Sequence, residues 1–231
     1  IGSAFGLLKR KAIYRDGLGA VLITDDYDVN KKPLTPKRST PNNSTPFPYG
    51  NAEPKDTVFP NVDYQKLNET IDTIFNNRNQ TRSVIVLYKD KIIAEKYDTG
   101  FTKNSKQIGW SMTKSITSTI FGILKCQGKI DLEANNLFKV WENDDRKDIT
   151  IHNLLQMNSG LEWTEDYNTI SDVTKMLFLE KDMTKVQIDK PLVGKPNETW
   201  NYSSGTTNML SGIIRQQFNT HQEYLDYWYS S

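Results

Sequence analysis

The hydrophobic pattern of the first 110 residues predicts three short strands. An unbroken apolar run over residues 18–24 is bounded by a glycine and two aspartates, which is typical of a strand. Two further apolar stretches, residues 83–88 and 91–97, are separated only by Lys89 and Asp90. Strands joined by such a short polar segment form an antiparallel hairpin. This part of the chain therefore predicts antiparallel sheet.

Apolar residues at helical spacing predict one helix before the hairpin and several after it. The first covers residues 64–77, with Asp63 as its N-cap. From residue 111 onward the pattern predicts helices and no strand. These helices cover residues 111–127, 149–157 (capped by Thr150 and followed by a stop at Gly160), 171–180 and 204–218. A helix followed by an antiparallel hairpin indicates an α+β fold.

We expect the chain to divide into three parts. Residues 1–61 contain the first predicted strand and then an extended arm, because residues 31–61 are rich in Pro, Asn, Thr and Ser. Aromatic side chains in the arm indicate that it lies along a surface. Residues 62–110 carry the first helix and the hairpin, and residues 111–231 form a mostly helical part.

Composition and charge restrict the class of function. The 231 residues include 29 basic and 28 acidic side chains without a basic patch, which argues against nucleic acid as a partner. No apolar stretch reaches the roughly 18 residues that a membrane-spanning helix needs. One cysteine and two histidines cannot supply a typical zinc site. The cysteine, Cys126, is expected to be a buried, small apolar residue.

Candidate chemistry begins at Ser111. On a helix that starts there, Ser111 and Lys114 share one face with hydroxyl-bearing residues and Gly122, whereas Met112 and Ile116 lie on an opposite, apolar face. Small residues indicate that another segment packs close and buries Lys114, which favours an uncharged amine. Such an amine can take the proton of a hydroxyl one turn away, and N–H groups at the helix start can stabilise an oxyanion. The sequence thus predicts Ser111 as nucleophile and Lys114 as base; the alternative is a chance match of two residues.

A second motif lies in residues 200–205 (WNYSSG), where a tyrosine and small polar residues lead into a predicted helix. A phenol near Lys114 would relay a proton to a leaving group, so Tyr202 is a third candidate catalytic residue. The alternative is a turn with a structural tyrosine.

Together these motifs resemble the class C β-lactamase and D-alanyl-D-alanine peptidase superfamily of serine hydrolases. Residues 111–114 (SMTK) match S-x-x-K, and residues 202–204 (YSS) match Y-x-N/S. Residues 149–161 (ITIHNLLQMNSGL) are similar to a stretch between these motifs in the family, and Leu132 stands in a segment similar to D-L-D-x-P. All four occur in the family's order and spacing, within residues 62–231.

Within this superfamily the chain looks closest to the 6-aminohexanoate-dimer hydrolase and esterase branch. Residues 162–167 (EWTEDY) include an E-D-Y similar to that of the branch, whose tyrosine lies near the substrate amide. The resemblance implies substrate-binding roles for Tyr167 and Ser204; for Tyr167 the alternative is a structural aromatic in a loop. Ser204 stands where class C lactamases have Asn, which weakens an interpretation as a lactam hydrolase.

The resemblance implies a β-lactamase-like fold: an antiparallel sheet flanked by helices, plus an all-helical domain. It also implies a serine hydrolase that forms an acyl-enzyme with short amides, esters or peptides. No metal or organic cofactor is implied. The family resemblance further implies export to the periplasm or cell surface. Ser111 would attack the carbonyl, Lys114 would accept its proton and Tyr202 would protonate the leaving group. The alternatives are a D,D-peptidase and a catalytically silent homologue that binds ligands.

One family motif has no counterpart in the sequence. The third motif, K-T-G or H-x-G, lies in the family on a sheet strand that supplies the second oxyanion donor, and it is absent from residues 1–231. We therefore expect a C-terminal segment or a second chain to complete the sheet. Residues 1–231 alone are expected to be inactive on p-nitrophenyl esters.

Overall fold

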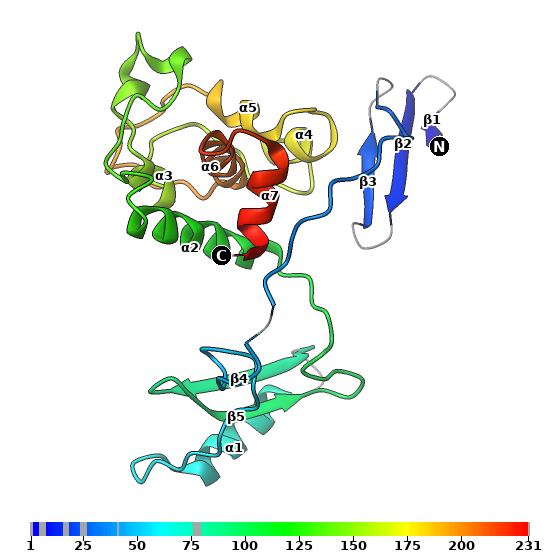
Figure 1. Ribbon diagram of the computed structural model, residues 1–231. Coiled ribbons are helices and arrows are strands. Elements are labelled where there is room, and N and C mark those ends of the chain that lie inside the picture. The colour runs from blue at the N-terminus through cyan, green and yellow to red at the C-terminus, as the bar shows by residue number, and fades with distance from the viewer. Residues whose placement is uncertain are drawn as a thin grey trace. The chain divides into compact units, whose positions relative to one another are not determined.

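The computed structural model describes residues 2–4, 8–15, 19–23, 27–40, 42–75 and 80–230. The chain divides into two compact units, one of residues 39–110 and one of residues 1–38 with 111–231. Helices and two small antiparallel sheets give the α+β fold that the sequence predicts (Figure 1).

The N-terminal sheet has three antiparallel strands in the order β1 (Gly2–Ala4), β2 (Leu8–Arg15) and β3 (Gly19–Ile23). β3 lies within the strand predicted over residues 18–24, whose two end residues fall outside the described residues. The pattern does not predict β2, because its sequence LKRKAIYR alternates basic residues with few apolar ones. Pairing with a strand on each side satisfies its backbone groups and makes it a strand.

The unit of residues 39–110 contains α1 (Tyr64–Ile74) and the hairpin of β4 (Ser83–Tyr88) and β5 (Lys91–Tyr97). Both elements confirm the sequence prediction, and Asp63 caps α1 by accepting a hydrogen bond from the backbone of Lys66. Lys89 and Asp90 have φ angles of +46° and +57°, as a two-residue turn between twisted strands requires.

The predicted arm lies against this hairpin. The Tyr49 hydroxyl donates to Asp90 at 3.0 Å, and the rings of Phe59 and Tyr88 meet edge to face with centroids 4.9 Å apart. Ile85 and Leu87 of β4 are nearly half exposed. One face of the hairpin is therefore apolar and open in the part of the unit that the structure describes.

The helical part is built around one central helix. Its helices are α2 (Thr113–Cys126), α3 (Ile151–Leu155), α4 (Asp172–Phe178), α5 (Met183–Ile188), α6 (Ser204–Gln216) and α7 (His221–Ser230), with the 3₁₀ turns η1 (Trp110–Met112), η2 (Lys139–Trp141) and η3 (Asp145–Asp148). α6 contacts each of the other α-helices of this part (Figure 1). Fully buried side chains from α2, η2, α3 and α6 form the core: Phe121, Leu124, Trp141, Leu154, Met209 and Ile214.

Predicted helix starts agree well with the structure, whereas one predicted helix end is wrong. Thr150 forms the expected cap, in a reciprocal box with Asn153. Gly160, however, lies five residues beyond the last residue of α3. Its φ is +76°, and a Cβ there would lie 2.3 Å from the carbonyl oxygen of Gly194. Gly160 is thus required by a tight backbone crossing and does not terminate the helix.

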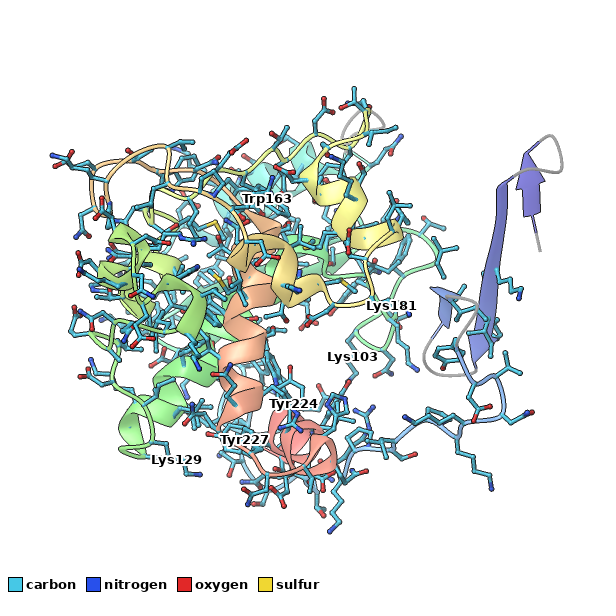
Figure 2. All side chains as sticks on the ribbon, turned by 90° about the horizontal axis from the view of Figure 1, so that it is seen from above. Lys103, Lys129, Trp163, Lys181, Tyr224 and Tyr227 are labelled. Atoms are coloured by element: carbon cyan, nitrogen blue, oxygen red, sulfur yellow. The ribbon has the colours of Figure 1, made fainter. Side chains whose placement is uncertain are left out.

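α5 and α7 are absent from the sequence prediction. α7 is held by aromatic packing: the rings of Phe218 and Tyr227 lie 5.0 Å apart, and Lys129 Nζ lies 5.3 Å from the Tyr227 ring centroid. Figure 2 labels Tyr224 and Tyr227 on this helix and Lys129 near it. No helix among the described residues has the length and apolar character needed to cross a membrane.

Candidate active site

The first two predicted site residues meet at the start of α2. Ser111 lies in η1, directly before α2, and Lys114 lies in the first turn of the helix. Lys114 Nζ donates a hydrogen bond to Ser111 Oγ across 3.1 Å. Ser111 is exposed and Lys114 is partly buried, so solvent reaches the hydroxyl while the amine is sheltered.

The buried face of α2 differs from the prediction. Its buried side chains are Thr117, Ile120, Phe121 and Leu124, which face the core. Met112 and Ile116, which were predicted to pack, are 66% and 53% exposed because they lie outside this buried face. Cys126, which was predicted to be buried, is also exposed. The small polar face with Gly122 is also exposed in the part that the structure describes. Lys114 is instead sheltered by residues at the start of α6.

Tyr202 and Ser204 bring the start of α6 to Lys114. The Ser203 hydroxyl caps α6 by accepting from the backbone of Thr206, which fixes the residues on either side of it. Lys114 Nζ lies 4.8 Å from the centroid of the Tyr202 ring and donates to Ser204 Oγ at 3.1 Å. Two motifs far apart in the sequence thus meet at one amine.

The phenol of Tyr202 interacts with both Ser111 and Lys114. Burial alone would raise its pKa, but hydrogen bonding with these two side chains and the charge of Lys114, when present, outweigh burial. The pKa of Tyr202 is therefore lowered from its usual value. A phenol in this position can exchange a proton with the amine or the hydroxyl beside it.

Glu165 is a member of the site that the sequence does not predict. Its carboxylate accepts hydrogen bonds from the Ser204 backbone N–H at 2.9 Å, the Tyr167 hydroxyl at 2.7 Å, the Ser204 hydroxyl and the Trp163 indole N–H. Burial alone would raise the pKa of Glu165, but these donors together lower it. A partly buried, ionised carboxylate therefore stands one hydroxyl away from Lys114.

Tyr167, the predicted substrate-binding residue, lies in the same cluster. Its hydroxyl is held by Glu165, while 58% of the residue is exposed to solvent. The pKa of Tyr167 is raised by burial, by the hydrogen bond to Glu165 and by the negative charge of Glu165. Hydrogen bonding with Ser204 lowers this pKa, but it does not outweigh the other effects. Tyr167 thus presents an exposed ring and a protonated phenol at the site.

The loop that carries Glu165 is fixed on both sides. The Thr164 N–H donates to Asp172 Oδ2 at 3.0 Å, and the other oxygen of Asp172 pairs with Lys190 at 2.6 Å. The Trp163 carbonyl accepts from the Asn201 side chain at 3.0 Å. These contacts tie the loop to the start of α4 and to the segment before α6.

The Trp163 ring also packs on the first turn of α6. A Cβ added at Gly205 would lie 2.5 Å from Cζ3 of Trp163, so the close approach depends on glycine. Trp163 is 6% exposed, and Figure 2 labels it among the packed side chains. This packing aims the indole N–H at Glu165.

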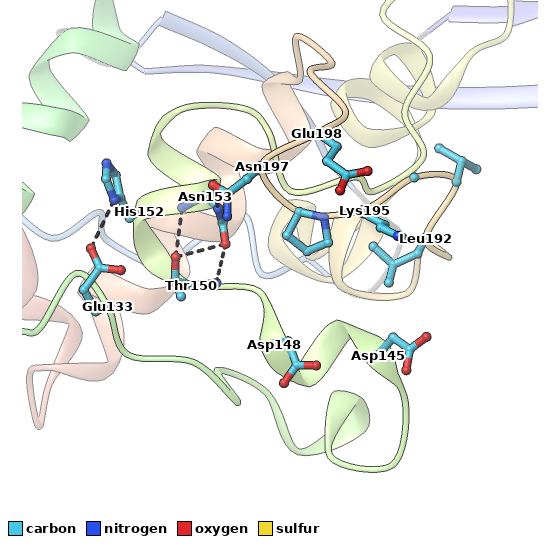
Figure 3. A pocket seen from close by; sticks show the side chains of 13 residues that line it. Glu133, Asp145, Asp148, Thr150, His152, Asn153, Leu192, Lys195, Asn197 and Glu198 are labelled. Atoms are coloured by element: carbon cyan, nitrogen blue, oxygen red, sulfur yellow. Dashed lines mark hydrogen bonds and ion pairs between the residues drawn. The ribbon is translucent and has the colours of Figure 1, made fainter.

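A separate cavity of about 710 Å³ contains none of the predicted site residues (Figure 3). Its lining includes His152, which pairs with Glu133 at 3.1 Å, and the capping pair Thr150 and Asn153. No group of three or more His, Cys, Asp or Glu side chains suited to a metal ion occurs among the described residues.

Comparison with known proteins agrees with this fold. The family model described as Beta-lactamase matches residues 71–228. A solved structure from Bacillus anthracis, provisionally described as a 6-aminohexanoate-dimer hydrolase, is similar with a TM-score of 0.51 and 20% sequence identity. The similarity covers 67% of this chain and 43% of that chain, so this chain spans less than half of its length. No curated protein matches significantly.

Proposed function

Because the chain belongs to the beta-lactamase family of serine hydrolases, we propose that it carries the acylation machinery of an amidase or esterase. Ser111 is the nucleophile, Lys114 is its base and Tyr202 is the proton donor for the leaving group. The substrates are short amides, esters or peptides. The observation that supports this proposal most strongly is that Ser111, Tyr202 and Ser204 all lie next to the Lys114 amine.

Acylation needs three proton movements that this geometry supports. Ser111 Oγ attacks the carbonyl carbon while its proton passes to the uncharged Lys114 amine, 3.1 Å away. The tetrahedral intermediate collapses, the C–N or C–O bond breaks, and Tyr202 gives its proton to the leaving nitrogen or oxygen. Lys114 then returns its proton to the Tyr202 phenolate, which leaves an acyl-enzyme and a free amine or alcohol.

Water completes the reaction through the same groups. Water attacks the acyl carbon, and the bond from that carbon to Ser111 Oγ breaks. One water proton passes to Ser111 Oγ through Lys114 or Tyr202, and the remaining hydroxyl becomes part of the product acid. The start of α2 places the positive end of a helix next to Ser111, where Met112 offers no side-chain cap. Backbone N–H groups there would stabilise the negative oxygen of the intermediate.

The proposed substrate class is supported by the loop of Glu165 and Tyr167. Tyr167 offers an exposed aromatic ring at the Glu165 loop, which suits an extended, partly apolar chain. The Bacillus anthracis protein's description as a 6-aminohexanoate-dimer hydrolase supports short linear amides as the first class to examine. Export to the periplasm or cell surface, and completion of the sheet by a further segment or chain, belong to the same proposal.

A fluorophosphonate probe tests the nucleophile. The full-length protein should become covalently labelled, and Ser111→Ala should abolish the labelling because Ser111 is the hydroxyl that Lys114 contacts at the start of α2. Ser118→Ala is the matched control, since Ser118 is an exposed hydroxyl on α2. Undiminished labelling of Ser111→Ala would rule out this nucleophile.

Measured turnover of two substrates distinguishes the proposed amidase from the two alternative functions. A D,D-peptidase would cleave a D-Ala-D-Ala peptide faster than a 6-aminohexanoate dimer, and the proposed amidase would do the reverse. A silent, ligand-binding homologue would neither turn over either compound nor react with the probe.

A further inference from the structure

The carboxylate of Glu165 is linked to Lys114 through a single hydroxyl. Ser204 Oγ accepts from Lys114 Nζ at 3.1 Å and donates its own proton to Glu165. A serine hydroxyl has one proton to donate, so the carboxylate sets its direction and leaves a lone pair for the amine. We propose that Glu165 is a positioning residue that acts through Ser204 to hold the Lys114 amine beside Ser111. This inference rests on the proposed function of Ser111 and Lys114.

Glu165 is itself held tightly enough for such a role. Its two oxygens receive four donors: two from Ser204, one from Tyr167 and one from Trp163. Hydrogen bonds to an ionised group are shorter and stronger than neutral ones, and a partly buried charge needs such partners. The carboxylate also lies at the N-terminus of α6, where a helix favours negative charge.

The loop contacts limit movement of Glu165 along its backbone. Thr164, its neighbour, is bonded to the carboxylate of Asp172, which is paired in turn with Lys190. The backbone N–H of Val173 donates to the Thr164 carbonyl at 3.3 Å. A carboxylate fixed in this way can orient Ser204 without reorganisation during turnover.

A carboxylate that only stabilised the loop would not need Ser204 to affect the reaction, whereas its charge acts on nearby titratable groups in either case. In the described structure the titratable groups around Glu165 are Lys114 of α2, Tyr202 before α6, and Asp166 and Tyr167 of its own loop. Asp172 and Lys190 pair with each other. The charge of Glu165 raises the pKa of Tyr202, although other contacts lower it overall. Removal of that charge should therefore lower the pKa of Tyr202 further.

Glu165→Gln removes the charge and keeps the shape. In the full-length protein with ring-¹³C-labelled tyrosine, the Tyr202 resonance, assigned with Tyr202→Phe, should titrate about 0.5–1 pH unit lower than in the unmodified protein. Asp166→Asn is the matched control: it removes the same charge one residue away, from a carboxylate that bonds only to Asn168 and Thr169 in the described structure. The control should leave the Tyr202 titration unchanged.

This titration needs no turnover, so its result is separate from that of the proposed function. An equal Tyr202 titration in Glu165→Gln and the unmodified protein, or an equal shift in Asp166→Asn, would overturn the inference.

Kinetics give a second readout. In Glu165→Gln the rate–pH profile should move to lower pH, because loss of the negative charge favours the phenolate of Tyr202. The value of kcat should fall about tenfold or more with little change in KM, since a misplaced base slows chemistry more than binding.

Ser204→Ala provides a variant that keeps the charge but breaks the link. It should lower kcat to a similar extent while the midpoints of the rate–pH profile move less than in Glu165→Gln. Wild-type kcat in Ser204→Ala would overturn the inference even if Glu165→Gln failed to fold.

Discussion

The phenol of Tyr202 lies beside the nucleophile and the base. Its proton is needed in the reaction only when the leaving group must be protonated. An amine leaving group must be protonated as the C–N bond breaks, whereas p-nitrophenolate leaves readily without a proton. The lowered pKa of Tyr202 makes its proton easier to give up than that of a free phenol.

Tyr202→Phe should therefore slow amide hydrolysis far more than ester hydrolysis. We expect kcat/KM for a short linear amide to fall roughly 10²-fold or more, and kcat/KM for its p-nitrophenyl ester to fall much less. Steady-state kinetics of the two substrates with the same acyl group measure the difference. Equal losses for both would show that Tyr202 acts in attack or in packing and not on the leaving group.

Single residues also show where prediction from the sequence reaches its limit. Ser111, Lys114 and Tyr202 belong to motifs with fixed spacing, so their types alone indicate the chemistry. Glu165 has no such signal, because its partner Ser204 lies 39 residues away and only the fold joins them. The one sequence feature that could have drawn attention to Glu165 is its position in the E-D-Y segment that ends at Tyr167.

At the scale of elements, the contact between Trp163 and α6 links stability to the site. Gly205→Ala should destabilise the protein by about 1–3 kcal/mol, because the new methyl would overlap the buried indole and the side chain of Gln187. It should also lower kcat, because a displaced Trp163 no longer donates correctly to Glu165. Urea unfolding and amide kinetics measure the two effects.

Gly122→Ala is the matched control in α2. A Cβ at Gly122 meets nothing within 4 Å among the described residues, and alanine favours a helix more than glycine does. This variant should be stabilised by about 0.5–1 kcal/mol and keep its activity. Destabilisation equal to that of Gly205→Ala would show that a further segment covers the small face of α2.

Elements with strong local signals were predictable, and those formed by pairing or aromatic packing were not. The apolar hairpin and the capped helices agree with the sequence pattern, since caps and turns act within a few residues. β2 carries too many charges to show a strand pattern and depends on its neighbours in the sheet. α7 depends on rings contributed from outside it, such as Phe218.

At the scale of the whole molecule, the order of elements and motifs identifies the family even though many details differ. A helix followed by a hairpin indicated the fold class, and the spacing from residue 111 to residue 204 indicated the family that the match over residues 71–228 shows. The buried faces of α2 could not be derived in the same way, because they depend on which helices surround it. Prediction therefore succeeded where the covalent chain sets the geometry and failed where tertiary packing sets it.

The most direct test of the central claim is to locate the acyl group on the enzyme. After brief reaction of the full-length protein with a slowly hydrolysed ester and acid quenching, trypsin should release residues 107–114 (QIGWSMTK), in which Ser111 is the single serine. Mass spectrometry should find the acyl mass on this peptide, with fragment ions that place it on Ser111. An acyl group on any other residue, in protein that still turns the ester over, would contradict the account.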